Sequence, residues 1–184
     1  MKQVEIDFDY LDNLGAILIR VMWSGEPLNP IKCSVAGGAI RDMLLQKPIS
    51  DIDVFYEGTL VTEELKESFK LVQSTNHNYP DGFNITHTVM FKDIPVPIQL
   101  IQVKNIEEHI ATFPTPMSRV SYNHSKGLEG VDMDFVYQVN EQEFFWDDKV
   151  DMKYFDKIKA KYSDWEHIFL KPEDNPYYEG ELAF

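Results

Sequence analysis

The sequence predicts an α+β fold, with helices packed against a β-sheet in a single domain. Apolar residues recur every three or four positions from Tyr10 to Met22, which is typical of an amphipathic helix. Residues 51–56 (DIDVFY) and 96–103 (VPIQLIQV) are rich in the residue types that favour strands. With 184 residues, 43% of them hydrophobic, the chain can bury one good core and little more.

We therefore expect one domain over residues 1–184, with a core at about 9–146 and a C-terminal helix and acidic tail at 150–184. The last residues, KPEDNPYYEGELAF, are polar, acidic and contain proline. They suit either a docked arm or a disordered tail.

The first half of the chain alternates helical and extended segments. The N-terminal helix should end near Gly25, and residues 34–36 should close a short strand before a Gly-Gly turn. Leu65, Phe69 and Val72 repeat at helical spacing. The elements expected here are a helix from Asp9, a strand at 34–36, a helix at 39–45, a strand at 51–56 and a surface helix at 61–73.

The second half contains most of the expected strands. A turn at 92–95 should join strands at 86–92 and 96–103. Asn105 is typical of an N-cap and Pro114 of a helix end, so a short helix should lie between them. The remaining expectations are strands at 131–139 (VDMDFVYQV) and 143–146 (EFFW) and a closing helix at 151–165.

Asp51 and Asp53 are the first candidates for chemistry. Side chains two apart on a strand point to the same face, with their roots about 7 Å apart. Two such carboxylates can lean together and share hard divalent cations, for which Mg²⁺ (or Mn²⁺) is suited. The pair therefore predicts a metal site.

A phosphate site is expected just upstream. Gly37 and Gly38 let the backbone approach a ligand closely, and the start of a helix attracts anions. Arg41, in the first turn, can add a bidentate phosphate contact. The order along the chain is thus a phosphate clamp followed by a metal strand.

The segment GGAIRDMLLQKPISDID closely resembles the signature of the polymerase-β-like nucleotidyltransferase superfamily. The nearest subgroup is similar to the head domain of class II CCA-adding enzymes and bacterial poly(A) polymerases. The resemblance is specific over about residues 33–56 and looser up to about residue 140. It implies the nucleotidyltransferase fold, a mixed β-sheet packed against helices. It also implies that the glycines and the Arg-Asp pair hold a nucleoside triphosphate and that the DxD aspartates bind catalytic metals. The matching positions are Gly37, Gly38, Arg41, Asp42, Asp51 and Asp53.

Two departures from the family pattern bear on catalysis. Many relatives place a third carboxylate on a neighbouring strand as a base, where this chain offers Gln99, whose amide cannot take up a proton at pH 7. Asp132 or Asp134 can replace it if their segment lies beside the DID strand, and we expect one of them to serve as the base. The chain is also far shorter than a CCA-adding enzyme, so we expect the domains that select the base and hold tRNA to be absent.

Arg119 is a further candidate for the nucleotide site. It follows the turn FPTP, and nucleotidyltransferases of this kind commonly complete the pocket with residues beyond the sheet. The five histidines show no ligand spacing, and a single cysteine, Cys33, excludes an internal disulfide and a Cys-based zinc site.

The charge balance argues against a polynucleotide partner. The chain has 31 acidic and 17 basic residues, a net charge of −14, and no basic patch. We expect that the lysines of residues 153–162 do not share one helical face, which favours a solvated surface. We therefore expect the acceptor to be a small molecule or a protein rather than a long RNA. No basic leader and no apolar run of spanning length is present, so we expect a cytoplasmic protein without membrane partners.

These observations predict a Mg²⁺-dependent nucleotidyltransferase that uses an NTP as substrate. Two alternatives remain open: a degenerate nucleotide-binding module without turnover, and an acidic interaction or inhibitor protein whose charge imitates nucleic acid. The preferred base, the acceptor and the oligomeric state are not predicted.

Overall fold

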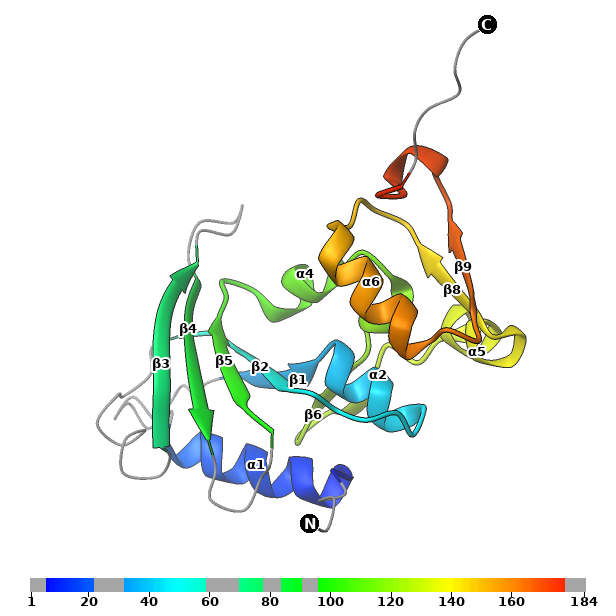
Figure 1. Cartoon of the computed structure of the whole chain (residues 1–184). Helices are drawn as coiled ribbons and strands as arrows, with labels where there is room; N and C mark the ends of the chain where they lie inside the picture. Colours follow the sequence, from blue (N-terminus) through cyan, green and yellow to red (C-terminus); the bar gives the residue numbers. More distant parts are fainter. Residues whose placement is uncertain (1–5, 22–31, 59–69, 78–83, 91–95, 178–184) are drawn as a thin grey trace, which may run out of the picture.

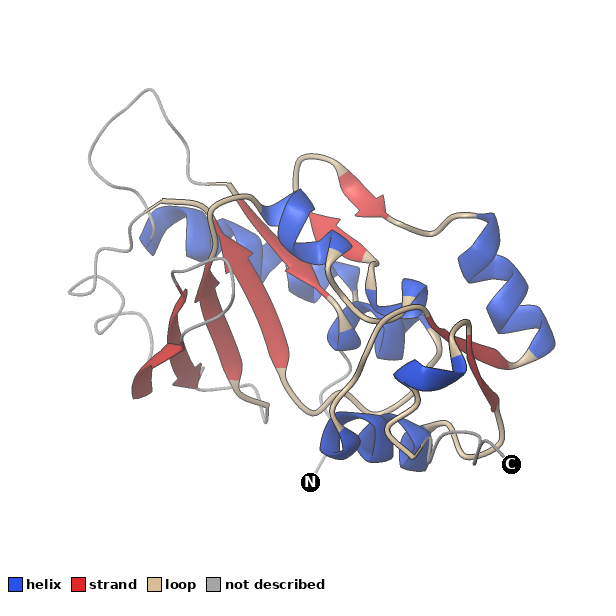
Figure 2. Cartoon of the chain, turned by 90° about the horizontal axis from the view of Figure 1, so that it is seen from above, coloured by secondary structure: helices blue, strands red, loops and turns tan. Residues whose placement is uncertain are grey.

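A seven-stranded sheet forms the centre of the fold in the described residues (Figures 1 and 2). The computed structural model describes residues 6–21, 32–58, 70–77, 84–90 and 96–177. The strands of this sheet are β1 (Cys33–Ala36), β2 (Ile52–Tyr56), β3 (Lys70–His77), β4 (Asn84–Met90), β5 (Ile98–Gln102), β6 (Ser121–Asn123) and β7 (Gly127–Glu129). Their order is β3-β4-β5-β2-β1-β6-β7. Because β2 and β5 are parallel and the other neighbours antiparallel, the sheet is mixed, as predicted.

Helices cover the sheet, and a smaller C-terminal unit lies beside α2, on the far side from β3 and β4 (Figure 1). The helices are α1 (Phe8–Val21), α2 (Gly38–Leu44), α4 (Ile106–Ala111), α5 (Met133–Glu141) and α6 (Met152–Lys161), with 3-10 turns at Pro116–Ser118 and Pro172–Asp174. In the C-terminal unit, β8 (Glu143–Trp146) and β9 (Glu166–Phe169) form a separate parallel pair. Within the described part of the chain, no helix is both long and apolar enough to cross a membrane.

The alternation of side chains along β2 separates two cores. Ile52, Val54 and Tyr56 are buried with residues of α1 and α2. Phe55 points the other way and packs under α4, with Ile106 of that helix. Because side chains two apart share a face, Asp53 lies on the same side of β2 as Phe55.

The C-terminal unit shares the larger core. Trp146 of β8 and Phe155 of α6 are buried in the same cluster as Ile40 of α2. Their rings pack edge to face, with centroids 5.3 Å apart. The core therefore extends beyond the predicted limit near residue 146 and takes in the closing helix.

Most expected elements are confirmed, including α1, α2, β2, β5, α6 and the Asn105-capped α4. The strand expected at 131–139 is wrong, because this segment is the helix α5. Asp132 starts it by accepting a hydrogen bond from the Phe135 amide, and Phe135 and Gln138, three apart, bury one side. The helix expected at 61–73 is wrong over its last four residues, which belong to β3; residues 61–69 lie outside the described residues. β6, β7 and β9 were not predicted.

Candidate active site

The predicted metal and phosphate segments meet in one cleft of about 390 Å³. The start of β2 and the neighbouring part of β5 form its floor, while the start of α2, the end of α4 and one side of α6 form its walls. We call it the carboxylate cleft. Its polar lining includes Gly37, Gly38, Arg41, Asp42, Ser50, Asp51, Asp53, Gln99, His109, Ser118, Lys149, Asp151, Lys157 and Lys161.

Asp53 is the most perturbed acid of the cleft. Burial, together with the smaller effect of the Asp51 charge, raises the pKa of its carboxyl to about 7, and Lys157 opposes the rise. Among the described residues, no side chain or backbone group donates a hydrogen bond to this carboxyl. Asp53 therefore keeps its negative charge at a cost unless a cation comes close.

Asp51 and Gln99 complete the floor. The Ser50 hydroxyl donates to the Asp51 carboxylate at 2.8 Å, and the Lys157 ammonium lies 4.0 Å from it. Gln99 of β5 pairs with Asp53 of β2, and its amide Nε2 lies 3.5 Å from the Asp51 Oδ2. Gln99 thus occupies the neighbouring-strand position at which the family resemblance leads us to expect a third carboxylate.

This donor set fits a divalent cation. Asp51 and Asp53 offer carboxylate oxygens, the hard ligands that Mg²⁺ prefers, and their mutual repulsion would be relieved by such an ion. In the described part of the chain no cluster of three His, Cys, Asp or Glu side chains is placed to hold a metal. A cation here would therefore take its remaining ligands from substrate phosphate and water, as is usual for Mg²⁺.

The glycine turn is constrained at Gly37 rather than at Gly38. Gly37 has φ +78°, a conformation that side chains rarely adopt, and a Cβ there would lie 3.3 Å from the Phe113 ring. A Cβ on Gly38 would meet only the Arg41 side chain, at 3.4 Å. Both glycines line the carboxylate cleft, and their contact with a nucleotide stays a prediction.

Arg41 is buried and paired within the protein, and the phosphate contact expected of it stays a prediction. Its side chain is 1% exposed and contacts the Asp42 carboxylate at 2.7 Å, the Ser118 hydroxyl at 2.8 Å and the Tyr162 hydroxyl at 3.1 Å. Burial alone would lower the pKa of the guanidinium, but the charge of Asp42 outweighs this and raises it. Lys161 also pairs with Asp42. The Arg-Asp pair thus ties α2 to α6 at the wall of the cleft.

Three further candidates lie outside the cleft lining. Arg119 donates to the Phe113 carbonyl and pairs with Asp147 at 2.7 Å, so its guanidinium is engaged within the protein. Asp132 caps α5, and Asp134 lies in the first turn of that helix. Since β1 and β5 are the neighbours of β2, the expected placement of Asp132 or Asp134 beside the DID strand is wrong.

Three lysines that line the cleft, Lys149, Lys157 and Lys161, were not predicted as site residues. Lys157 and Lys161 are one helical turn apart on α6, and both face the cleft together with Lys149. The expected solvated surface holds for Lys157, whose side chain is 52% exposed, but not for Lys161, which is 17% exposed and pairs with Asp42. Their i, i+4 spacing was the available signal.

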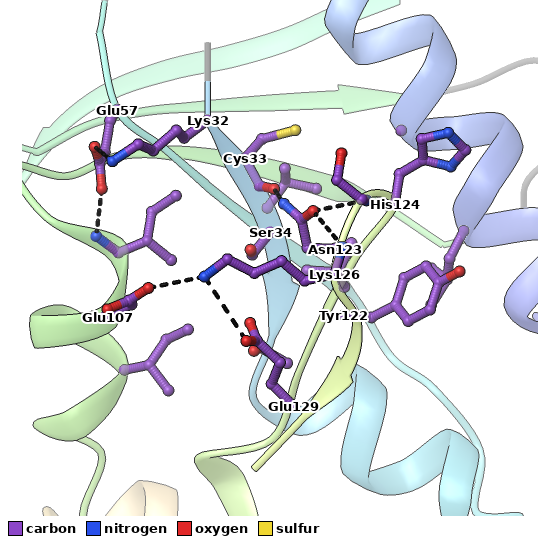
Figure 3. Close-up of a pocket in the computed structure, with 18 of the residues that line it drawn as sticks. Lys32, Cys33, Ser34, Glu57, Glu107, Tyr122, Asn123, His124, Lys126 and Glu129 are labelled. Carbon is purple, nitrogen blue, oxygen red and sulfur yellow. Dashed lines mark hydrogen bonds and ion pairs between the residues drawn. The ribbon is translucent and has the colours of Figure 1, made fainter. Parts of the chain in front are cut away.

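A second cavity, of about 400 Å³, lies on the other side of α4 (Figure 3). Its charged groups are already paired: Lys32 with Glu57 at 3.4 Å, and Lys126 with Glu107 at 2.9 Å. Asn123 donates to the Cys33 carbonyl at 2.5 Å. The cavity therefore presents no unpaired charge that would select a ligand, in contrast to the carboxylate cleft.

Comparisons with known proteins agree with this architecture. Residues 33–120, just under half of the chain, match the family model of the poly A polymerase head domain. A search of curated proteins finds no match.

Solved structures with the same fold include CCA-adding enzymes. The Thermotoga maritima CCA-adding enzyme in complex with tRNA is 18% identical, with a TM-score of 0.54 over 77% of this chain and 33% of that one. A CCA-adding enzyme bound to CTP is 14% identical, with a TM-score of 0.60 over 92% of this chain and 43% of that one. The chain thus spans less than half the length of these structures. It has the polymerase-β-like nucleotidyltransferase fold and resembles the head domain of CCA-adding enzymes and poly(A) polymerases.

Proposed function

We propose that the protein transfers a nucleoside monophosphate from an NTP to an acceptor hydroxyl, with Mg²⁺ or Mn²⁺ as cofactor. The observation that carries this proposal is the convergence of Asp51, Asp53, the Gly37-Gly38 turn and the α6 lysines on one cleft. A carboxylate pair facing lysines across a cleft suits a metal-bound triphosphate, because each charge then has a partner. The head-domain match and the CTP-bound neighbour support the same assignment.

In this proposal each group of cleft residues has its own role in the reaction. Asp51 and Asp53 would hold the metal, which when bound activates the acceptor hydroxyl and neutralises charge on the phosphates. Lys157 and Lys149 would contact the β and γ phosphates, and the turn at Gly37 would let backbone approach them. In the transfer, the acceptor hydroxyl gives up its proton to water and its oxygen bonds to the α phosphorus. The bond from that phosphorus to the β-bridging oxygen breaks, and pyrophosphate leaves. Positioning and charge neutralisation supply most of the rate enhancement.

We infer that the acceptor is a small molecule or a protein rather than a long RNA. Net charge of −14 repels a polyanion, and the cleft lysines are few enough to be occupied by the triphosphate itself. The tRNA complex of the Thermotoga maritima enzyme concerns a much longer chain.

The test is transfer of label from each α-labelled NTP, with Mg²⁺ or Mn²⁺, in a host lysate, followed by asking whether label reaches RNA, protein or a small molecule. We expect Asp51→Asn and Asp53→Asn to abolish transfer while the fold is kept. Asp134→Asn, outside the cleft, is the matched control and should keep full activity. Near-wild-type turnover by Asp53→Asn in saturating Mg²⁺ would contradict the assignment.

A second candidate is a nucleotide-binding module without turnover. Gln99 favours it, because an amide beside Asp53 cannot accept the proton of the acceptor hydroxyl. Calorimetry separates the two: this module binds NTP with Mg²⁺, whereas no pyrophosphate appears with any acceptor fraction.

A further inference from the structure

The outward face of α5 is apolar. Met133, Val136 and Tyr137 follow one another at i, i+3 and i+4, and they are 81%, 41% and 49% exposed. Phe135 and Gln138 already attach the opposite side of the helix to the core. Surface helices normally present polar residues on the side that faces water. α5 therefore carries a second apolar stripe that the fold does not use.

This stripe continues into neighbouring segments. Val131, directly before the helix, is 41% exposed, and the Phe145 ring of β8 lies 6.1 Å from the Tyr137 ring. We call Val131, Met133, Val136 and Tyr137 the α5 surface. A contiguous exposed apolar patch of this kind marks an interaction site more often than an isolated exposed side chain does.

The charges around the α5 surface have one sign. Between residues 127 and 148 the chain has no Lys, Arg or His, and its acidic residues are Glu129, Asp132, Asp134, Glu141, Glu143, Asp147 and Asp148. Arg119 neutralises Asp147, and Lys126 lies 3.7 Å from Glu129.

Other carboxylates of this stretch stay without a cation. Among the described residues, no ion pair reaches Asp132, Asp134, Glu141 or Glu143. Glu141 lies one helical turn after Tyr137 on α5, and Glu143 shares a face of β8 with Phe145, whose ring packs against Tyr137. The charge of Glu143, some burial and the charge of Glu141 accordingly raise the pKa of the Tyr137 hydroxyl. The patch is thus apolar in the middle and acidic at its rim.

The negative charge of this rim determines which class of partner can bind the α5 surface. RNA and anionic lipid surfaces are repelled by it. A second copy of the same face would bring acidic rim against acidic rim, at a cost of like-charge contact. A cationic partner with apolar anchors satisfies both parts of the patch.

We propose that the α5 surface docks a basic amphipathic segment of a partner protein, whose apolar side chains cover Met133, Val136 and Tyr137 while Lys or Arg side chains meet the acidic rim. A helix with anchors at i, i+3, i+4 and i+7 matches the spacing of the patch. This surface lies outside the carboxylate cleft lining, so the proposal stands independently of nucleotidyl transfer.

The test uses three synthetic peptides of about 15 residues and the full chain, with fluorescence anisotropy at about 150 mM salt. One peptide has leucines at i, i+3, i+4 and i+7 among lysines; one has the same leucines among glutamates; one replaces the leucines by alanine. We expect the leucine-lysine peptide to bind at least about tenfold more tightly than the other two. Equal binding of the alanine-lysine peptide would reduce the interaction to bulk charge and overturn the proposal.

Variants locate the peptide on the protein. Met133→Ser combined with Tyr137→Ser should weaken binding about tenfold or more, and Glu141→Gln with Glu143→Gln should weaken it and flatten its salt dependence. Met152→Ser with Leu170→Ser, at side chains 49% and 60% exposed elsewhere, is the matched control and should change nothing.

Two results would overturn the proposal at this stage. One is equal loss of peptide binding in the Met152→Ser, Leu170→Ser control. The other is a concentration-dependent dimer in sedimentation that the Met133→Ser, Tyr137→Ser variant abolishes, since the occupant would then be a second copy.

Discussion

The ionisation of Asp53 makes the stability of the fold depend on pH. Its pKa is about 7 in the folded protein and near 3.8 in an unfolded chain, so between these values the folded state holds a proton that the unfolded state lacks. The free energy of unfolding therefore falls as pH rises from about 4 to about 7. Above pH 7 the stabilisation that comes from protonating Asp53 is lost completely. Because a tenfold change in proton affinity equals about 1.36 kcal/mol, the loss is at most about 4 kcal/mol.

In metal-free buffer, Asp53→Asn should therefore be more stable than the wild type at pH 8, and the difference should shrink toward pH 4. Urea unfolding at both pH values with a chelator present measures this. Adding Mg²⁺ should stabilise the wild type and leave the variant unchanged. Asp134→Asn serves as control, and an equal gain in that variant at pH 8 would exclude the cleft as the cause.

Gln99 limits the chemistry if the acceptor hydroxyl needs a base from the protein. Gln99→Glu places a carboxylate opposite Asp53, and general-base catalysis commonly contributes about 10² to 10⁴ in rate. We expect pyrophosphate release to rise at least about tenfold at unchanged NTP affinity. Gln99→Ala is the matched comparison and should give no rise; a fall in Gln99→Glu would show that the amide itself is needed.

At the scale of elements, the Arg41–Asp42 pair fastens α2 to α6. Arg41→Ala leaves the Asp42 carboxylate buried with fewer partners, and breaking a buried pair in this way costs about 3–5 kcal/mol. We expect a loss of that size in urea unfolding. Lys126→Ala, which breaks only exposed pairs that solvent screens, should cost far less.

The alternative for Arg41 has a distinct signature. If the guanidinium contacts phosphate, as the sequence suggested, Arg41→Ala would keep most of its stability and lose NTP affinity about tenfold or more.

α6 presents Lys157 to the cleft, with its side chain 52% exposed and therefore available to a ligand. Lys157→Ala should weaken NTP binding about tenfold or more, the range for a lost charge-assisted hydrogen bond. Lys153→Ala, on the same helix but outside the cleft lining, should leave affinity unchanged. Calorimetry with NTP and Mg²⁺ compares the two, and equal effects would indicate bulk charge alone.

The sequence predicted elements where local signals agreed. Asn105 and Pro114 bound α4, and the β-branched run after Asp51 forms β2. The strand prediction was wrong at α5, because VDMDFVYQV alternates like a strand. The Asp132 cap and the burial of Phe135 stabilise a helix there instead. β9 pairs with β8 across an intervening helix, a long-range contact that local patterns do not encode.

At the scale of the whole molecule, the charge distribution sets the expected response to nucleic acid. The net charge is −14, so tRNA at about 150 mM salt should not be retained by the chain in gel shift or filter binding. NTP binding should persist under the same conditions. Micromolar, salt-sensitive retention of tRNA would contradict the inference of a small or protein acceptor.

The candidate site could be predicted only in part, because some of its residues are far apart in the sequence. Its carboxylates and glycines lie within one short stretch, so their spacing alone brings them together. Lys149, Lys157 and Lys161 reach the same cleft only because the C-terminal unit packs against α2, more than a hundred residues away in sequence. Likewise, the burial of Arg41 and its pairing with Asp42 depend on hydrogen bonds to Tyr162 and Ser118, which are distant in sequence.

The double attachment of α6 has a thermodynamic consequence. One side of this helix lies in the aromatic core through Phe155 and Ile158, and the other faces the cleft through Lys157. A helix held in this way cannot leave one site without leaving the other. A ligand that binds only the assembled cleft therefore stabilises the C-terminal unit by RT ln(1 + [L]/Kd). Ligand concentration would then set how often residues 151–177 open to proteases, so the lifetime of the protein would depend on the occupancy of its cleft.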